Sequence, residues 1–272
     1  MSSLIESHLV RVSAAEALKR CRAKYIPNDD GTLRLAMVQE FSFPVFREDG
    51  FEEVGSRKIE QMFESSEQME AVKAEYQRRS ERRAKVAVLD LILCNPDLDT
   101  FCTFTYRPEG NERTSYDDVY KKLSVWCSNA VQRRDLKYVA VPEYHMDGEA
   151  IHFHMVANRS ALNLHFQHWK VKHKNGSPIY NIKDWLHGFS TAVEIAAGAE
   201  DRDAVAKYIF KYMGKQSGQK IGGRYYLHGG KLRKPVYVLA ETPEVFFEGQ
   251  NPVYHRELDI VDGAKYREWS FI

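Results

Sequence analysis

The stretch Leu136–Asn158 reads "LKYVAVPEYHMDGEAIHFHMVAN", and it places two strand-like runs on either side of an Asp-Gly pair. Asp-Gly between such runs is among the strongest short signals for a β-hairpin. If Asp147 and Gly148 form a two-residue turn, counting outward sets Glu143 directly opposite His152. The stretch therefore predicts an antiparallel hairpin in this register.

The hairpin brings three potential metal ligands together. Side chains in a strand alternate between faces, so His152 and His154 share one face, and Glu143 lies on that face of the partner strand. One carboxylate and two imidazoles are suitable ligands for Mg²⁺, Mn²⁺, Zn²⁺ or iron, with positions left open for substrate. His145 is either a further ligand or a rim residue. The alternative is a pair of core histidines hydrogen-bonded to backbone or to each other.

Composition sets the broad class. The chain has 272 residues, of which 43% are hydrophobic and 28% are charged, as expected for a globular protein with one substantial core. It has no run of about 20 apolar residues, and "MSSLIESHLVRV" lacks the form of a signal peptide. We expect a cytoplasmic protein without a membrane partner. The four cysteines form no C-x-x-C pair and are expected to be reduced, partly buried thiols: Cys21, Cys94, Cys102 and Cys127.

Charge is unevenly distributed along the chain. The formal net charge is only +1, yet residues 204–240 contain no Asp or Glu. The basic residues in that stretch are Lys207, Lys211, Lys215, Lys220, Arg224, Lys231, Arg233 and Lys234. A second basic run, "QRRSERRAK", precedes residue 86. Such runs are commonly solvated faces, but a long stretch without acids indicates a local anionic partner.

Further elements surround the hairpin. A long helix is expected from about Ser56 to Leu93, and "TFCTFTYRPEGN" has the composition of a strand closed by a turn. "SYDDVYKKLSVWCSNAVQRR" predicts a helix after a Ser or Asp cap. We divide the chain into an N-terminal accessory region (1–85), a central domain (86–240) and a C-terminal extension (241–272).

The segment "DRDAVAKYIFKYMGK" predicts a short helix that ends at Gly214. Its apolar stripe comprises Val205, Ala206, Ile209, Phe210 and Met213, and its opposite side carries Tyr208, Lys211, Tyr212 and Lys215. A tyrosine is a candidate nucleophile when a nearby cation or metal activates its hydroxyl. The alternative is a tyrosine pair that covers the edge of the core beside lysines reaching for solvent.

The segment "GGRYYLHGGKLRKP" follows this helix. Its glycines, aromatics and cations suit a groove in which DNA phosphates approach the backbone and bases stack on Tyr225 or Tyr226. The candidate DNA contacts are Lys220, Arg224, Tyr225, Lys231 and Arg233. A structural hairpin rich in turns is an equal alternative for the glycines.

The order of "FCTFTY", then "IHFH" with a glutamate nine residues upstream, then "YIFKYMGK" resembles the HUH superfamily of single-strand DNA endonucleases. The two tyrosines four residues apart are similar to those of the rolling-circle replication initiators of single-stranded DNA phages and some plasmids. The resemblance covers about residues 86–235. Phe104 stands where many members have Leu.

The resemblance implies an α+β fold with a central, mostly antiparallel sheet flanked by helices, as in RRM-like cores. It also implies a metal-dependent endonuclease and strand transferase. Glu143, His152 and His154 would hold Mg²⁺ or Mn²⁺. Tyr208 or Tyr212 would attack phosphorus to give a 5′-phosphotyrosine link and a free 3′-OH.

Further roles follow from the same resemblance. Lys211 and Lys215 would stabilise phosphate charge or lower a phenol pKa, and the second tyrosine would later help to rejoin the ends. The partner would be single-stranded origin DNA in a host cytoplasm. The sequence has no G-x-x-x-x-G-K-[ST] motif, so unwinding would need a host helicase besides a polymerase.

Three other functions stay open. The first is a single-tyrosine relaxase or transposase-type HUH nuclease. The second is a non-catalytic module that binds single-stranded nucleic acid, which would need neither the paired histidines nor the tyrosines. The third is a metal-dependent hydrolase that uses bound water. A covalent protein–DNA adduct distinguishes nicking by tyrosine from the second and third.

Overall fold

The computed structural model describes residues 18–43, 66–107, 111–145, 147–166, 176–195, 205–206, 209–210, 212–213, 220–240, 242–247, 249–259 and 265–271. The chain divides into two compact units: residues 1–62 together with 235–272, and residues 63–234. The boundaries expected from the sequence, at residues 85 and 240, do not coincide with the edges of these units. The physical reason is strand pairing between the two ends of the chain.

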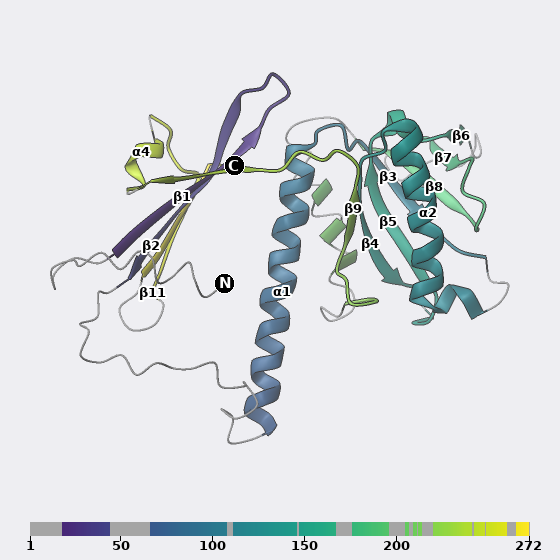
Figure 1. Cartoon of the computed structure of the whole chain (residues 1–272), viewed down its shortest axis with the longest axis horizontal. Helices are drawn as coiled ribbons and strands as arrows, with labels where there is room; N and C mark the ends of the chain where they lie inside the picture. Colours follow the sequence, from purple (N-terminus) through teal and green to yellow (C-terminus); the bar gives the residue numbers. More distant parts are fainter. Residues whose placement is uncertain are drawn as a thin grey trace. The chain divides into compact units, whose positions relative to one another are not determined.

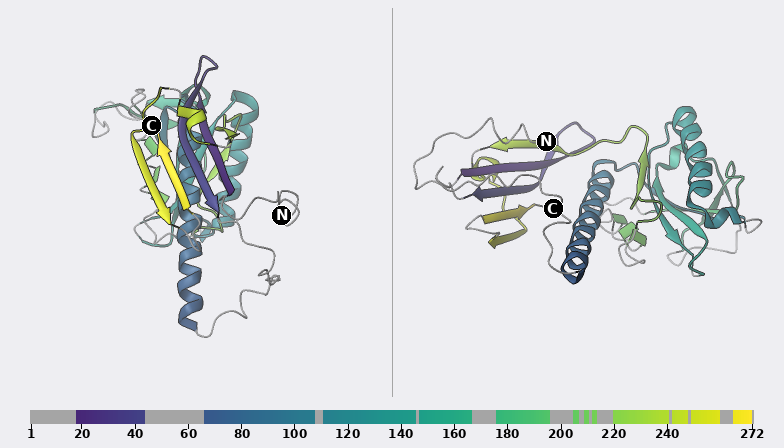
Figure 2. Two further views of the ribbon diagram at one scale, coloured as in Figure 1. Left: turned by 90° about the vertical axis from the view of Figure 1, so that its left-hand side faces the viewer. Right: turned by 60° about the horizontal axis from the view of Figure 1, so that its bottom comes forward.

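The first unit contains a five-stranded antiparallel sheet in the order β10-β1-β2-β12-β11. Its strands are β1 (Leu18–Pro27), β2 (Leu33–Phe43), β10 (Val236–Ala240), β11 (Tyr254–Asp259) and β12 (Lys265–Ser270). The short helix α4 (Glu244–Phe247) contributes Phe246 to a small core with Ala23 and Val38. Figure 2 shows the purple N-terminal and yellow C-terminal strands side by side in this sheet.

The second unit contains a seven-stranded sheet in the order β6-β7-β8-β3-β5-β4-β9, with every pairing antiparallel. Its strands are β3 (Thr100–Phe104), β4 (Tyr138–Tyr144), β5 (Ile151–Ala157), β6 (Leu164–Phe166), β7 (Ile179–Ile182), β8 (Ser190–Glu194) and β9 (Leu227–Gly229). The expected α+β class with a mostly antiparallel sheet is confirmed. The two strands of the predicted hairpin are β4 and β5, and β5 lies between β3 and β4.

Two long helices flank this sheet, α1 (Ser66–Cys94) and α2 (Tyr116–Arg134) (Figure 1). Residues 56–65, in which the first helix was expected to begin, lie outside the described residues. The predicted cap of α2 is Ser115, whose side chain accepts a hydrogen bond from the Asp118 backbone N–H. Short 3₁₀ turns, η4 (Asn111–Thr114) and η5 (Arg159–Ala161), join the larger elements.

The two faces of the sheet carry separate cores. On the α2 face, Phe104 and Phe153 pack with Trp126. On the α1 face, Val141 and Val156 belong to a cluster that also contains α1 residues and the stripe Val205, Ala206, Ile209 and Met213. Because side chains alternate along β5, His152 and His154 share their face with Val156 and therefore face α1. The sheet is covered on both sides, which buries the site residues at least in part.

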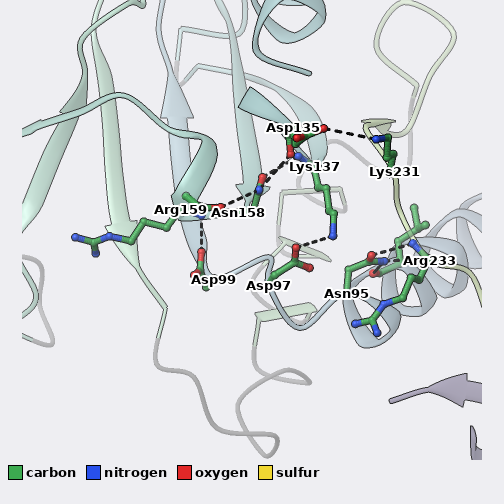
Figure 3. Close-up of polar contacts among 11 residues, drawn as sticks. Asn95, Asp97, Asp99, Asp135, Lys137, Asn158, Arg159, Lys231 and Arg233 are labelled. Carbon is green, nitrogen blue, oxygen red and sulfur yellow. Dashed lines mark hydrogen bonds and ion pairs between the residues drawn. The ribbon is translucent and has the colours of Figure 1, made fainter. Parts of the chain in front are cut away.

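Polar contacts join the loops at one end of the sheet (Figure 3). The Lys137 ammonium lies 2.7 Å from the Asp97 carboxylate, and the Asp99 carboxylate accepts a hydrogen bond of 2.7 Å from the Arg159 backbone N–H. The Asn95 amide bonds both the backbone N–H and the carbonyl of Arg233, each at 2.9 Å. These contacts fix where α1 ends and where the chain leaves β9.

All four cysteines are buried free thiols, as the sequence predicts. Among the helices in the described part of the chain, none combines the length and hydrophobicity that crossing a membrane requires.

Candidate active site

The β4–β5 pairing has the register inferred from the Asp-Gly signal. Glu143 is opposite His152, and Val141 is opposite His154. The connection is wider than the predicted two-residue turn, because the ladder ends at Tyr144 and the Gly148 backbone N–H donates to the His145 carbonyl at 2.8 Å. The longer loop keeps the register because its ends still pair in phase.

The Asp147 side chain stabilises this loop, and Gly148 adopts the left-handed conformation. The Asp147 carboxylate accepts hydrogen bonds of 3.0 Å from the backbone N–H groups of Glu149 and Ala150. The Gly148 φ of +75° is one that glycine adopts without strain. The Asp-Gly pair therefore has the expected role in reversing the chain, although the loop has a different length.

Glu143 and His154 form a direct buried contact. The Glu143 Oε2 atom lies 2.5 Å from His154 Nε2, and each side chain exposes 10% of its surface. A carboxylate at this depth needs a partner, and the imidazole supplies one. The predicted convergence of the carboxylate with this imidazole is present in the structure.

Two threonines orient the two imidazoles from the other side, one within β3 and one directly after it. The Thr103 hydroxyl lies 3.2 Å from His154 Nδ1, and the Thr105 hydroxyl lies 3.2 Å from His152 Nδ1. A hydroxyl can donate to or accept from an imidazole nitrogen, so both contacts suit either tautomer. This leaves Nε2 as the coordinating atom on each ring, the arrangement expected when Nδ1 has a second-sphere partner.

His152 is half-buried and stacks on His145, with ring centroids 4.7 Å apart and planes 9° apart. Burial lowers the pKa of His152 to about 4, with smaller contributions from His145 and His154. The ring is therefore neutral near pH 7. A neutral imidazole is the form that binds a metal ion.

The donor set fits a divalent ion by chemical type: one carboxylate and two imidazoles supported by hydroxyls. Over the described residues, however, no three His, Cys, Asp or Glu side chains are already arranged to hold a metal. The Glu143 carboxylate is engaged with His154 Nε2, the atom that a metal would require. Binding of an ion through all three groups therefore requires Glu143 and His154 to separate.

The tyrosine-bearing segment is helical in its described residues: Val205, Ala206, Ile209, Phe210, Tyr212 and Met213. The Tyr212 ring stacks on the His154 ring at 3.7 Å between centroids, and Phe101 packs beside both at 5.6 and 5.8 Å. Tyr212 thus packs against the apolar cluster and not on an opposite, solvated side, because the imidazole offers a flat partner. Tyr208, Lys211 and Lys215 lie outside the described residues.

The expected DNA-contact residues occupy different environments. Lys220 and Arg224 are exposed, with Lys220 Nζ 5.2 Å from the Tyr225 ring centroid and Arg224 Cζ 5.5 Å from that of Tyr120. Tyr225 exposes 9% of its surface, and its hydroxyl donates to the Gln77 carbonyl at 3.4 Å. Its ring is therefore a core residue of the α1 face, and Tyr226 is the less buried of the pair.

The last two expected contacts are held near the end of α2 and of α1. Lys231 Nζ lies 3.7 Å from the Asp135 carboxylate, and both side chains are largely exposed. Arg233 is fixed through its backbone by Asn95 (Figure 3). These cations lie away from the pair formed by Glu143 and His154, since Asn95 and Asp135 mark the opposite ends of β3 and β4 from the site residues.

Sequence reasoning did not single out Phe101, Thr103, Thr105 or Arg113. The first three lie two residues apart along β3 and its end, and register pairing sets Thr103 opposite His154, so the period of two was the available signal. Arg113 lines a small cavity of about 60 Å³ with Thr105, His145 and His152. No pattern around "NERT" points to this position, because a 3₁₀ turn delivers it from outside the sheet.

A family model for replication-associated proteins of the ORF2 type matches residues 99–217. The match begins at β3, includes the hairpin and ends after the tyrosine segment. It therefore spans all three candidate ligands and both tyrosines, but less than half of the chain. Comparisons with curated proteins and with solved structures return no significant match. Residues 99–217 are thus similar to replication-associated proteins, and this supports a role in replication.

Proposed function

We propose that this protein is a replication initiator of the rolling-circle type that nicks single-stranded origin DNA through a tyrosine. The observation that carries the proposal is the stacking of Tyr212 on His154, with Glu143 bonded to the same imidazole. A candidate nucleophile is thereby placed beside two candidate metal ligands. The similarity of residues 99–217 to replication-associated proteins supports the biological role.

The proposed reaction is a phosphodiester exchange. The phenol oxygen of Tyr208 or Tyr212 bonds to phosphorus, and the bond from phosphorus to the 3′ oxygen breaks. The phenol proton passes to solvent, and the 3′ oxygen takes up a proton. The products are a 5′-phosphotyrosine link and a 3′-OH that can prime synthesis. Reversal with the other tyrosine and the new 3′-OH rejoins the ends.

The protein's own groups have distinct parts in this proposal. Glu143, His152 and His154 hold a divalent ion such as Mg²⁺ or Mn²⁺, which when bound neutralises charge on the phosphate oxygens. Thr103 and Thr105 orient the imidazoles, and the packing of Tyr212 against Phe101 restricts where the phenol can move. Such placement removes much of the entropic barrier of a bimolecular attack.

Cations complete the proposed site. Arg113 lines the cavity next to His152 and suits a phosphate oxygen of the bound strand. Lys211 and Lys215 keep their proposed roles in stabilising phosphate charge or lowering a phenol pKa. A cytoplasmic replicon of phage or plasmid origin, with host helicase and polymerase as partners, remains part of the proposal.

The second candidate is a single-tyrosine nicking enzyme. The direct contact of Tyr212 with His154 favours it, since one phenol already lies on a candidate metal ligand. In that case Tyr212 is the nucleophile and Tyr208 belongs to the helix surface.

The test is covalent trapping. The protein is incubated with end-labelled single-stranded oligonucleotides and Mn²⁺, and adducts are resolved on a denaturing gel. His154→Ala and Glu143→Gln should reduce adduct yield by about 100-fold or more, because each removes a ligand. The matched control is His165→Gln, an exposed histidine on β6 of the same sheet, which should retain activity.

Each alternative predicts a different gel. Normal nicking by a His152→Ala/His154→Ala double variant would refute the metal assignment. Cleavage without any adduct would identify a hydrolase that uses water. Binding without cleavage under all metal conditions would identify a non-catalytic binding module.

A further inference from the structure

A cavity of about 380 Å³ lies between α2 and the segment 220–228, next to the pairing of β9 with β4. It is lined from α2 by Tyr120 and Ser124, from β4 by Tyr138, and from the following segment by Arg224, Tyr226 and His228. Volumes of this size are typical of sites for small organic ligands.

The cavity lies on the face of the sheet that α2 covers. Tyr138 packs with the core that contains Trp126 and Phe153, whereas the candidate active site faces the opposite core with Val141 and Val156. The cavity therefore cannot hold the phosphate that Tyr212 would attack. Its ligand must be a separate group or a separate part of the same strand.

A tight turn fixes the rim of the cavity. Ile221 and Arg224 pair across Gly222 and Gly223, which have φ values of +55° and +75°. A Cβ atom on Gly222 would lie 2.0 Å from the Tyr116 ring, so the turn is seated directly against α2. This seating holds Arg224 over Tyr120, and it makes the rim a built feature of the fold.

The lining combines aromatic rings with positive charge. Tyr226 and His228 stack at 5.8 Å with planes 26° apart, and Lys220 and Arg224 are the charged residues of the lining, which contains no carboxylate. Burial lowers the pKa of His228, which keeps this ring neutral near pH 7. Ser124 and Tyr138 add hydroxyls that can bond to the edge of a planar ring. The combination suits a flat heteroaromatic ring attached to an anion.

We propose that this cavity binds one nucleotide of single-stranded DNA, with the base against Tyr226 and His228 and the phosphate at Lys220 and Arg224. The assignment rests on the proposed function for the identity of the strand. It adds a base-binding site on the sheet face away from the nucleophiles. Stacking on aromatic rings beside cations is the usual physical basis of single-strand binding.

The test compares two strands of equal length, oligothymidylate and the same backbone with abasic sites, in buffer with chelator so that no cleavage occurs. Ser124→Phe fills the cavity and should weaken binding of oligothymidylate about tenfold, because it displaces a stacked base. It should leave binding of the abasic strand unchanged. The matched control is Ser128→Phe, an exposed serine one turn further along α2 and outside the lining.

Arg224→Gln should weaken binding of both strands and reduce the salt dependence of affinity, since a phosphate contact carries no information about the base. Its control is Arg133→Gln, an exposed arginine of α2 outside the lining. If melting followed by circular dichroism shows that Ser124→Phe does not fold, Ser124→Met fills the cavity with a flexible, unbranched side chain.

Equal effects of Ser124→Phe on both strands, or none, would overturn the proposal. Tight binding of thymidine monophosphate, with no difference between the two strands, would assign the cavity to a free nucleotide and also overturn it. The adduct assay with Mn²⁺ is scored separately. If no adduct forms while Ser124→Phe still discriminates between the strands, the nicking function fails and the base site stands. If adducts form without such discrimination, only the base site fails.

Discussion

The Tyr212 ring is stacked on the His154 ring, with centroids 3.7 Å apart and planes 24° apart. The same imidazole contacts Glu143 through Nε2 and Thr103 through Nδ1. A helix that follows the sheet in sequence is therefore seated on the face that carries the candidate metal ligands. This contact turns two short motifs into one site.

Phenylalanine substitutions separate the two tyrosines. Tyr212→Phe keeps the ring that stacks on His154, so we expect an unchanged melting temperature and a loss that reports chemistry. Each single variant should still form adducts but fail to release closed circles over repeated rounds, and the double variant should form none. Peptide mapping of the adducts by mass spectrometry is the measurement. Multi-round release by Tyr208→Phe, with Tyr212→Phe inactive, would instead identify a single-tyrosine enzyme.

Valine substitutions test the role of the threonines. Thr103→Val and Thr105→Val remove the hydroxyl partner of an imidazole at nearly constant volume. The Mn²⁺ concentration for half-maximal adduct formation should rise about tenfold, as for loss of a second-sphere ligand, and excess Mn²⁺ should restore activity. The control is Thr191→Val, which pairs with Thr103 from β8. An unchanged Mn²⁺ midpoint in both variants would show that the hydroxyls do not position the ligands.

The cysteines should be chemically inert while the protein is folded. Burial raises the pKa of Cys127 to about 12 and also raises that of Cys102, so the reactive thiolate is scarce at pH about 8. Iodoacetamide should label the native protein slowly and the chain in denaturant at all four positions, as counted by mass spectrometry. Rapid labelling of native Cys127 would contradict the packing of α2 against the sheet.

The Asp147 carboxylate should stabilise the β4–β5 loop in a pH-dependent way. Its pKa is lowered by hydrogen bonds from the backbone N–H of Glu149 and then of Ala150. A lowered pKa means that the contribution is present above the unfolded value of about 3.9 and is lost as the pH falls. Asp147→Ala should therefore melt earlier than the native chain at neutral pH, and the gap should close on acidification.

The control for this prediction is Glu149→Ala, an exposed carboxylate of the same loop. Its melting temperature should follow that of the native chain across the same range. A gap for Asp147→Ala that stays constant with pH would show that the loop does not depend on the ionised carboxylate.

Local patterns in the sequence were sufficient for the elements around the site. The Asp-Gly signal and the alternation of β5 predicted the pairing of Glu143 with His152, and the Ser115 cap predicted the start of α2. These features depend on neighbouring residues, so they are legible without the fold. The loop length was missed because several turns preserve the same register.

Long-range packing was not legible in the same way. The pairing of β1 with β10 and of β2 with β12 joins segments from opposite ends of the chain. Neither end shows a pattern that names its partner, because strand pairing depends on shape and register between distant surfaces. The division of the chain therefore differed from the one expected.

The sequence by itself determined the identity and the shared face of His152 and His154, because strand alternation is a property of the backbone. Only the tertiary structure decided which groups meet that face: Tyr212 on the His154 ring, Glu143 on its Nε2 and Thr103 on its Nδ1. The physical reason is that stacking and hydrogen bonding require positions accurate to fractions of an ångström. The packing of β3, β4, β5 and the tyrosine segment together provides that accuracy, and no local pattern encodes it.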